Sequence, residues 1–329
     1  MEKVKLKGAF SPNPRIEPLL DGTIQIPGVE ITWQSGRTGE LHLRHLTENS
    51  CDIFEFSLSN FMIVRDHPSE RERLRWTALP VFLSKAFMWL DFSVHVDSGI
   101  ASLADLRGKR VGVPDYHMTA AIWMRIVLRE LYGIRPVDIE WFNGRHPGLS
   151  HGRDVGTALA SGIRLTHAKQ AGEIGEKLCR GELDAAFGGT GAAVNKASSV
   201  RPLFGPGEAA QVMAEFRRKT GMTPTNHVVI VQRDVIDRHP EIALQLYRAF
   251  EMSKCEAYER ARRFAAGYLF FVEDAFAKQA AVFGDDPFPS GLTANRGMLA
   301  TFARASCDEG LLSAMPDIDA LFCGTIGPT

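Results

Sequence analysis

The sequence has no long hydrophobic run and no marked excess of charge of either sign. No stretch approaches the ~18 consecutive apolar residues that span a bilayer, which excludes a membrane-spanning protein. The 38 Lys and Arg residues nearly balance the 39 Asp and Glu residues, so the formal net charge is −1 and no bulk field draws the chain to nucleic acid or an anionic membrane. These absences leave a small molecule as the expected partner.

Cysteine is also scarce. The five cysteines are odd in number, widely scattered and free of any C-x-x-C spacing with neighbouring histidines, which argues against a disulfide framework and a zinc site. We expect them to be reduced thiols and each to be a buried structural residue, although a lone active-site thiol stays open. They are Cys51, Cys179, Cys255, Cys307 and Cys323.

The N-terminal segment lacks the features of a secretory leader. In residues 1–10 apolar and charged residues alternate as in a strand, and neither an apolar run of roughly 7–15 residues nor a small-residue cleavage site follows. The sequence therefore predicts a cytoplasmic protein.

The chain does have enough apolar residues, 45% of 329, for two hydrophobic cores. Short apolar runs that are typical of strands, such as Val29–Trp33, Cys51–Phe56 and Val228–Gln232, alternate with helical patterns at Thr119–Leu131 and Asp234–Phe264. This alternation predicts an α/β protein.

The pattern changes sharply at Asp97-Ser98-Gly99, where we place a domain boundary. The predicted domain 1 is discontinuous and comprises residues 1–96 and 226–329, and the predicted domain 2 comprises residues 97–225. Several phrases in this order resemble the type II periplasmic binding protein fold, which implies two α/β domains with a ligand cleft between them. The phrases are Leu103-x-x-Leu-Arg-Gly-Lys-Arg-Val-Gly-Val-Pro114, Gly181-Glu-Leu-Asp-Ala-Ala-Phe187 and Arg233-Asp-Val-Ile-Asp-Arg-His-Pro240.

Four further phrases are more specific. They are Glu55-Phe-Ser-Leu-Ser-Asn60, Leu79-Pro-Val-Phe82, Gly108-Lys-Arg-Val-Gly-Val-Pro-Asp-Tyr-His-Met-Thr-Ala120 and Thr220-Gly-Met-x-Pro-x-x-His-Val-Val-Ile230. Together they resemble the 4,5-dihydroxyphthalate decarboxylase family, over roughly residues 5–260. The resemblance implies a cytoplasmic carboxy-lyase of aromatic degradation, acting on 4,5-dihydroxyphthalate or a close analogue in phthalate catabolism. The stretches Gly144–Leu165 and Gly188–Ala192 depart from that family, which carries an arginine near the position of Gly191.

Removing a carboxylate from an electron-rich ring without a cofactor requires anchors for carboxylate groups, a proton for the ring carbon that loses CO2, and partners for the phenolic hydroxyls. In open α/β sheets such groups lie beyond the carboxyl ends of strands. Glu55 ends a predicted strand, where it could accept a phenolic proton or, with a pKa raised by an apolar cleft, protonate the ring. A glutamate there could equally be solvated or paired with an arginine.

His227 is the second predicted catalytic residue. It directly precedes the apolar run Val228–Val231, where the chain returns to domain 1, so it could face the ligand. A histidine that merely caps a core strand through a hydrogen bond would have the same sequence signature.

Nine residues at predicted strand ends and turns are expected substrate contacts. They are Arg15, Ser57, Ser59, Ser84, Lys85, Tyr116, His117, Thr119 and Thr190. Lys85 and Arg15 are the expected carboxylate anchors, although either could be an ordinary surface cation. His117 begins a predicted helix, where an anion is favoured and the imidazole could donate to a carboxylate. Thr119 and Thr190 could serve only as capping or turn residues.

No metal site and no cofactor are predicted, although a metal ion that assists the reaction stays open. His146, His151 and His167 lie in a polar loop without a partnering carboxylate pattern, which is typical of a solvated loop. A thiamine-precursor-type synthase on the same fold would need a Cys- and His-rich segment, which the sequence lacks. The main alternative to the decarboxylase is a solute-binding protein for an aromatic acid, and a homo-oligomer is a further possibility.

Overall fold

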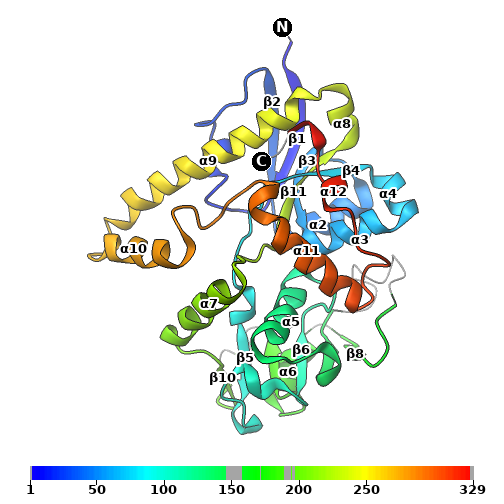
Figure 1. The fold of residues 1–329 in the computed structure, drawn as a ribbon, viewed down its shortest axis with the longest axis vertical. Helices are drawn as coiled ribbons and strands as arrows, with labels where there is room; N and C mark the ends of the chain where they lie inside the picture. Colours follow the sequence, from blue (N-terminus) through cyan, green and yellow to red (C-terminus); the bar gives the residue numbers. More distant parts are fainter. Residues whose placement is uncertain (1, 146–157, 171, 189–193, 195–196, 327–329) are drawn as a thin grey trace. The chain divides into compact units, whose positions relative to one another are not determined.

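The computed structural model describes residues 2–145, 158–170, 172–188, 194 and 197–326 (Figure 1). The chain forms two compact units. Unit 1 comprises Met1–Lys85, Thr225–Leu299 and Pro316–Thr329, and unit 2 comprises Ala86–Pro224 and Ala300–Met315.

Unit 1 is built on a five-stranded sheet with the order β2-β1-β3-β11-β4. Its strands are β1 (Val4–Phe10), β2 (Val29–Ser35), β3 (Ile53–Ser57), β4 (Trp76–Leu79) and β11 (His227–Gln232). Strand β1 pairs in parallel with β2 and β3, whereas β11 runs antiparallel to β3 and β4. The sheet therefore joins four strands within residues 4–79 with one strand, β11, from much later in the chain.

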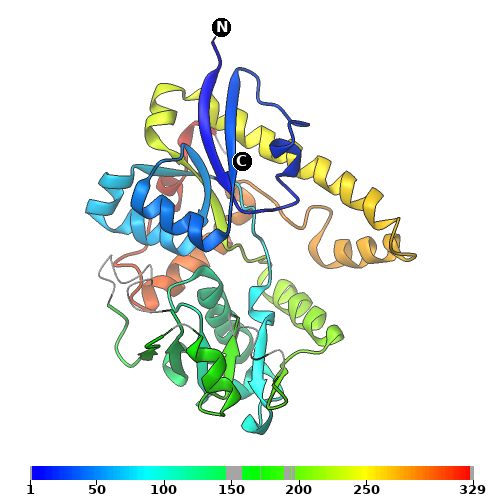
Figure 2. The ribbon, with the colours of Figure 1, turned by 180° about the vertical axis from the view of Figure 1, so that it is seen from behind.

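The helices of unit 1 are α1 (Glu17–Leu20), α2 (Thr38–Glu48), α3 (Leu58–Asp66), α4 (Pro68–Leu74), α8 (Arg233–Arg238), α9 (Glu241–Ala265), α10 (Val272–Phe283) and α12 (Ile318–Leu321). Most of them lie around this sheet, whereas α10 lies at the outer end of α9 (Figures 1 and 2). The core packs apolar side chains of β1, β3 and β11, such as Phe10, Ile53 and Val229, against α9 residues such as Leu246 and Phe250. Burying a side chain of this size contributes about 1.5–3 kcal/mol.

Unit 2 contains a six-stranded sheet with the order β10-β5-β9-β6-β7-β8. The strands are β5 (Phe92–His95), β6 (Arg110–Val113), β7 (Glu140–Asn143), β8 (Arg164–His167), β9 (Ala185–Phe187) and β10 (Val200–Pro202). The helices are α5 (Thr119–Tyr132), α6 (Glu173–Cys179) and α7 (Pro206–Thr220). Glycine is required at Gly112 in β6, since a Cβ atom there would lie 2.9 Å from Ile174 of α6.

The unit boundaries differ from the predicted domain boundaries in two places. Strand β5 pairs with β9 and β10, so residues 86–96 belong to the second sheet and not to domain 1. Helix α11 (Leu292–Asp308) contains a second boundary, and Ala300–Met315 pack in unit 2 although the prediction assigned them to domain 1. The periodicity of apolar residues predicts that a segment is helical, but it does not predict which of two hydrophobic cores the helix packs against.

None of the helices that the structure describes is both long and apolar enough to cross a membrane. All five cysteines are free thiols. Cys51 and Cys323 are buried as expected, whereas Cys179 and Cys307 are only partly buried and Cys255 is exposed.

Candidate functional site

Glu55 lies in the middle of β3, a fully buried strand of unit 1. Every residue of β3 is buried, and Glu55 is 2% exposed. Its neighbours on β3 are apolar, as expected for a strand covered on both faces, so an ionisable side chain is the exception there. A carboxylate in this position needs hydrogen-bond donors to offset the loss of water.

Four donors from three separate segments meet the Glu55 carboxylate. His227 Nδ1 lies 2.7 Å from Oε1, and the Ser84 hydroxyl donates to the same oxygen at 2.7 Å. Ser11 donates to Oε2 through its hydroxyl and through its backbone N–H, the latter at 3.2 Å. The structure thus brings together the predicted residues Glu55, His227 and Ser84, and it adds Ser11, which was not predicted.

The sheet register explains why these groups meet. In the antiparallel pair of β11 with β3, Val229 lies opposite Glu55 and His227 opposite Ser57. Side chains two residues apart point to the same face of a strand, so His227 is the diagonal neighbour of Glu55 on one face. Ser11 directly follows β1, the parallel neighbour of β3 on its other side.

These donors decide the charge of Glu55. Burial raises its pKa, but the positive charge and hydrogen bond of His227 and the hydroxyls of Ser11 and Ser84 outweigh burial and lower the pKa to about 2. The hypothesis of a Glu55 with a raised pKa that protonates the ring is therefore wrong. Glu55 is an ionised acceptor that holds the Nδ1 proton of His227 and thereby fixes the tautomer of the imidazole.

A second histidine holds the His227 ring. His42 of α2 is buried, and its ring contacts those of Phe56 and His227 at centroid distances of 4.8 and 4.9 Å, the latter edge to face. His42 is not among the residues predicted from the sequence. Its spacing of three residues from His45, which stacks on Phe54 at 4.1 Å, is the helical signal that could have found it.

Arg15 is the predicted anchor with the best geometry for an anion. Its guanidinium lies 4.0 Å from the ring centroid of Phe288 and donates through Nη2 to the Leu83 carbonyl, while Nε is buried without a hydrogen-bond partner. Among the described residues it makes no ion pair. Burial lowers the pKa of Arg15, and the nearby Tyr258 and Glu55 oppose that effect.

The other predicted contacts in unit 1 are engaged within the protein. The Lys85 ammonium is buried and donates to Asn295 Oδ1, which argues against a direct role in anchoring a carboxylate. Ser57 is the N-cap of α3, and its hydroxyl accepts a hydrogen bond from the Asn60 N–H at 3.3 Å. Ser59 is buried in the first turn of α3.

Of the predicted contacts in unit 2, His117 lies beside Asp115. His117 Nδ1 lies 3.5 Å from one Asp115 oxygen, and Arg145 donates to the other at 3.1 Å. Burial raises the pKa of Asp115, but His117 and Arg145 outweigh burial and lower it to about 2. Tyr116 is fully buried, with its ring 3.8 Å from the Arg125 guanidinium, which argues against the predicted ligand contact.

Thr119 does not cap α5. The N-cap is Met118, and Thr119 is the first helical residue. Thr190, His146 and His151 lie outside the described residues, and His167, at the end of β8, lies 3.2 Å from the Asn143 side-chain nitrogen. Within the described part of the chain, no three His, Cys, Asp or Glu side chains are grouped as metal ligands.

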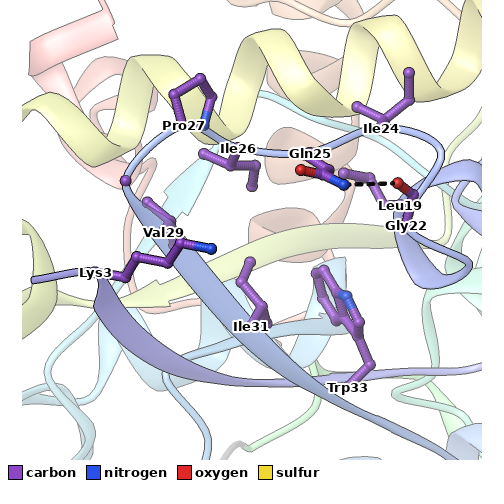
Figure 3. Close-up of a pocket in the computed structure, with 11 residues that line it drawn as sticks. Lys3, Leu19, Gly22, Ile24, Gln25, Ile26, Pro27, Val29, Ile31 and Trp33 are labelled. Atoms are coloured by element: carbon purple, nitrogen blue, oxygen red, sulfur yellow. Dashed lines mark hydrogen bonds between the residues drawn. The ribbon is translucent and has the colours of Figure 1, made fainter.

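A separate hollow in unit 1 does not contain the predicted site residues. It has a volume of about 400 Å³ and lies between the loop 22–28 and strand β2 (Figure 3). Its lining is mainly apolar, with Ile24, Ile31 and Trp33, and its one charged side chain is Lys3. The lining has no carboxylate or imidazole.

Two curated proteins are similar to this chain along its sequence. The 4,5-dihydroxyphthalate decarboxylase of Comamonas testosteroni is 31% identical over 318 residues, which cover 95% of this chain and 94% of the relative. The chain belongs to the 4,5-dihydroxyphthalate decarboxylase family. The protein of the same name from Pseudomonas putida is 33% identical over 188 residues, 57% of this chain and 71% of the relative. The family consists of carboxy-lyases, as the sequence predicted, and the similarity extends beyond the predicted residues 5–260.

Solved structures show the fold of this family member. The periplasmic aliphatic sulphonate binding protein SsuA of Escherichia coli superposes with a TM-score of 0.57 at 14% identity and covers 99% of both chains. The Candida albicans CA3427 product, described as having the generic periplasmic binding protein fold, gives 0.51 at 15% identity over 95% of this chain and 92% of that one. The predicted fold class is confirmed. No protein-family model matches the chain.

The lowered pKa of Glu55 predicts a loss of stability in acid. The folded state binds this proton less tightly than the unfolded chain, so the contribution of Glu55 is complete above about pH 4.5 and is lost as the pH falls towards 2. The loss amounts to about 3 kcal/mol. We expect Glu55→Gln to remove this part of the pH dependence of the unfolding free energy, measured by urea unfolding between pH 6 and 3.

The matched control is Glu30→Gln, which changes an exposed glutamate on β2 of the same sheet and is expected to leave the acid dependence unchanged. An equal acid dependence in wild-type protein and Glu55→Gln would show that the carboxylate is not held ionised by its donors.

Proposed function

We propose that this chain removes CO2 from 4,5-dihydroxyphthalate or a closely similar hydroxylated aromatic acid, and that the reaction uses no cofactor. The observation that carries the proposal is the 2.7 Å contact of His227 Nδ1 with a buried, ionised Glu55. A carboxylate that fixes one imidazole nitrogen leaves Nε2 free to exchange a proton with a substrate. The relatives' substrate, which their name gives, is an aromatic dicarboxylate with two hydroxyl groups.

In the proposed reaction His227 is the proton donor. Nε2 of the imidazolium gives its proton to the ring carbon that carries the carboxylate, and a C–H bond forms. The bond from that carbon to the carboxylate then breaks, its electron pair restores the aromatic ring, and CO2 leaves. Water returns the proton to Nε2. Glu55 stabilises the imidazolium throughout, and no oxidant or reductant is consumed.

Arg15 is proposed to hold a carboxylate of the substrate. Its guanidinium retains N–H groups that the described residues do not use, and its charge lies near Glu55. A guanidinium binds a carboxylate through two parallel hydrogen bonds, which would fix the ring relative to His227. Lys85 and Tyr116 are not proposed as contacts, because both are buried and engaged within the protein. The cytoplasmic location stays a prediction.

The test is incubation of the purified chain with 4,5-dihydroxyphthalate and a panel of hydroxybenzoic acids, with and without a chelator, while CO2 release and ring absorbance are followed. We expect CO2 from a member of the panel at a rate that the chelator does not change. Loss of turnover with the chelator would contradict the absence of a metal. Tight binding without CO2 release would instead favour the solute-binding alternative.

A further inference from the structure

Large apolar side chains gather at the turn that joins α9 to α10, at the end of α9 remote from the sheet of unit 1 (Figures 1 and 2). More than half of the surface of each is exposed, from 57% for Leu269 to full exposure for Phe270. The cluster, called the hairpin tip below, consists of Phe264, Tyr268, Leu269, Phe270 and Phe271. Isolated exposed apolar residues are normal, but five in eight positions mark an interaction surface.

The hairpin that presents this tip is held in place by polar contacts. Lys254 of α9 donates to Asp286 at 2.6 Å, in the loop that follows α10. Arg262 of α9 lies 4.3 Å from the Phe276 ring centroid of α10 and 3.5 Å from Glu273. The tip is therefore a preformed surface, which lowers the entropy that association must overcome.

The arginines beside the tip are already paired with acids. Arg260 contacts Asp21 at 2.6 Å and Glu256 at 3.1 Å. Arg263 contacts Glu256 at 3.3 Å, and Arg262 contacts Glu273 as described above. Anionic lipid surfaces attract clusters of Lys and Arg whose charges are not compensated by acidic side chains. The arginines beside the tip are compensated in this way, so they do not form such a cluster. The charge pattern therefore favours a protein partner over a membrane.

The area of the tip matches what a stable dimer needs. At roughly 150–250 Å² for each aromatic side chain, the exposed fractions give about 700 Å² of apolar surface on one chain. Two tips in contact would bury about 1,400 Å², within the roughly 1,200–2,000 Å² of specific interfaces. Because a two-fold axis places the same patch on both sides, one patch is sufficient. We propose that the hairpin tip is the surface through which two copies of this chain associate.

Sedimentation velocity of the full chain over a wide range of concentration tests this proposal. We expect the wild-type protein to have an even multiple of the chain mass of 36.3 kDa, and the double variant Phe270→Ser/Phe271→Ser to have half the wild-type mass. Exposed positions tolerate such changes within about 0.5 kcal/mol, so thermal unfolding of the variant should stay close to that of the wild type. Met252→Ser, at an exposed methionine of α9 outside the tip, is the matched control and should keep the wild-type mass.

A wild-type protein that stays at 36.3 kDa at every concentration would overturn the proposal, as would a double variant that keeps the wild-type mass. A wild-type monomer that cosediments with phosphatidylcholine–phosphatidylserine vesicles, and loses this property in the double variant, would also overturn it and identify the tip as a membrane contact.

Discussion

Replacing His227 with asparagine is expected to lower kcat/KM for decarboxylation by about 10²–10⁴, the usual contribution of a positioned proton donor. Asparagine retains an N–H group that can donate to Glu55, so the hydrogen bond at Oε1 and the burial of the carboxylate are preserved. What it lacks is the second ring nitrogen that transfers the proton. CO2 release from the best substrate of the panel measures the effect, and a near-normal melting temperature shows that the fold is intact.

The matched control is His239→Asn, because His239 follows α8 at the surface of the same unit and lies 3.8 Å from Glu241. It should keep wild-type activity. A His227→Asn enzyme that retains activity within about threefold of the wild type would place the proton donor elsewhere and reduce the Glu55–His227 contact to a structural role.

The Glu55→Gln variant tests whether the carboxylate orients and stabilises the His227 imidazole, because it leaves the proton-transferring ring itself in place. A glutamine side chain can donate its N–H2 to Nδ1, which would favour the tautomer with the proton on Nε2 and would no longer stabilise an imidazolium. Amide replacement of an orienting carboxylate is costly for that reason, up to about 10⁴ in a serine protease. The loss should appear in kcat more than in KM, since Glu55 is buried behind His227 and does not itself bind substrate in the proposed reaction.

The strands at the centre of unit 1 could be predicted from the sequence, but their pairing could not. The apolar runs Cys51–Phe56 and Val228–Gln232 predict buried strands, and the structure has strands at Ile53–Ser57 and His227–Gln232. Glu55 and His227 are 172 positions apart, and they meet because β11 runs antiparallel to β3 in one particular register. The alternation of side chains along each strand predicts which residues share a face but contains nothing about which strands are neighbours.

A local rule explains why one predicted helix is divided into two in the structure. The sequence predicted one helix from residue 234 to about residue 264, and the structure has α8 and α9 separated at His239 and Pro240. Proline lacks an N–H group and disfavours helical geometry in the residue before it, so the break has a local cause that periodicity alone overlooks.

The electrostatic state of Glu55 is the part of the site that the sequence was least able to predict. Burial by itself raises the pKa of a carboxylate, and that expectation was the basis of the ring-protonating hypothesis. The sign is reversed by Ser11, Ser84 and His227, which come from three different segments. Ser11 directly follows β1, so the rule that site residues lie beyond the carboxyl ends of strands could have predicted it. Its contact with Glu55, however, depends on the pairing of β1 with β3.

The largest stability effect is expected at a buried ion pair of unit 2. Arg125 Nη2 lies 2.7 Å from Glu309 Oε2, the two side chains are 1% and 5% exposed, and Nε of the arginine donates to the same oxygen at 2.8 Å. Glu309→Ala would leave the guanidinium buried beside Tyr116 without its counter-charge. Breaking a buried pair in this way costs about 3–5 kcal/mol. Unfolding by guanidinium chloride, followed by tryptophan fluorescence, measures the change; one of the five tryptophans, Trp141, has its ring centroid 5.7 Å from the guanidinium.

Two further variants distinguish the loss of a charge partner from the loss of packing. The double variant Arg125→Met/Glu309→Leu removes both charges and should recover most of the stability, because apolar side chains of similar size need no counter-charge. Glu140→Ala breaks the exposed pair with Arg164 in the same unit and should cost no more than about 1 kcal/mol. A Glu309→Ala protein as stable as Glu140→Ala would mean that the guanidinium reaches water or a new partner. In that case the segment Ala300–Met315, which carries Glu309, would not be held in unit 2 by this pair.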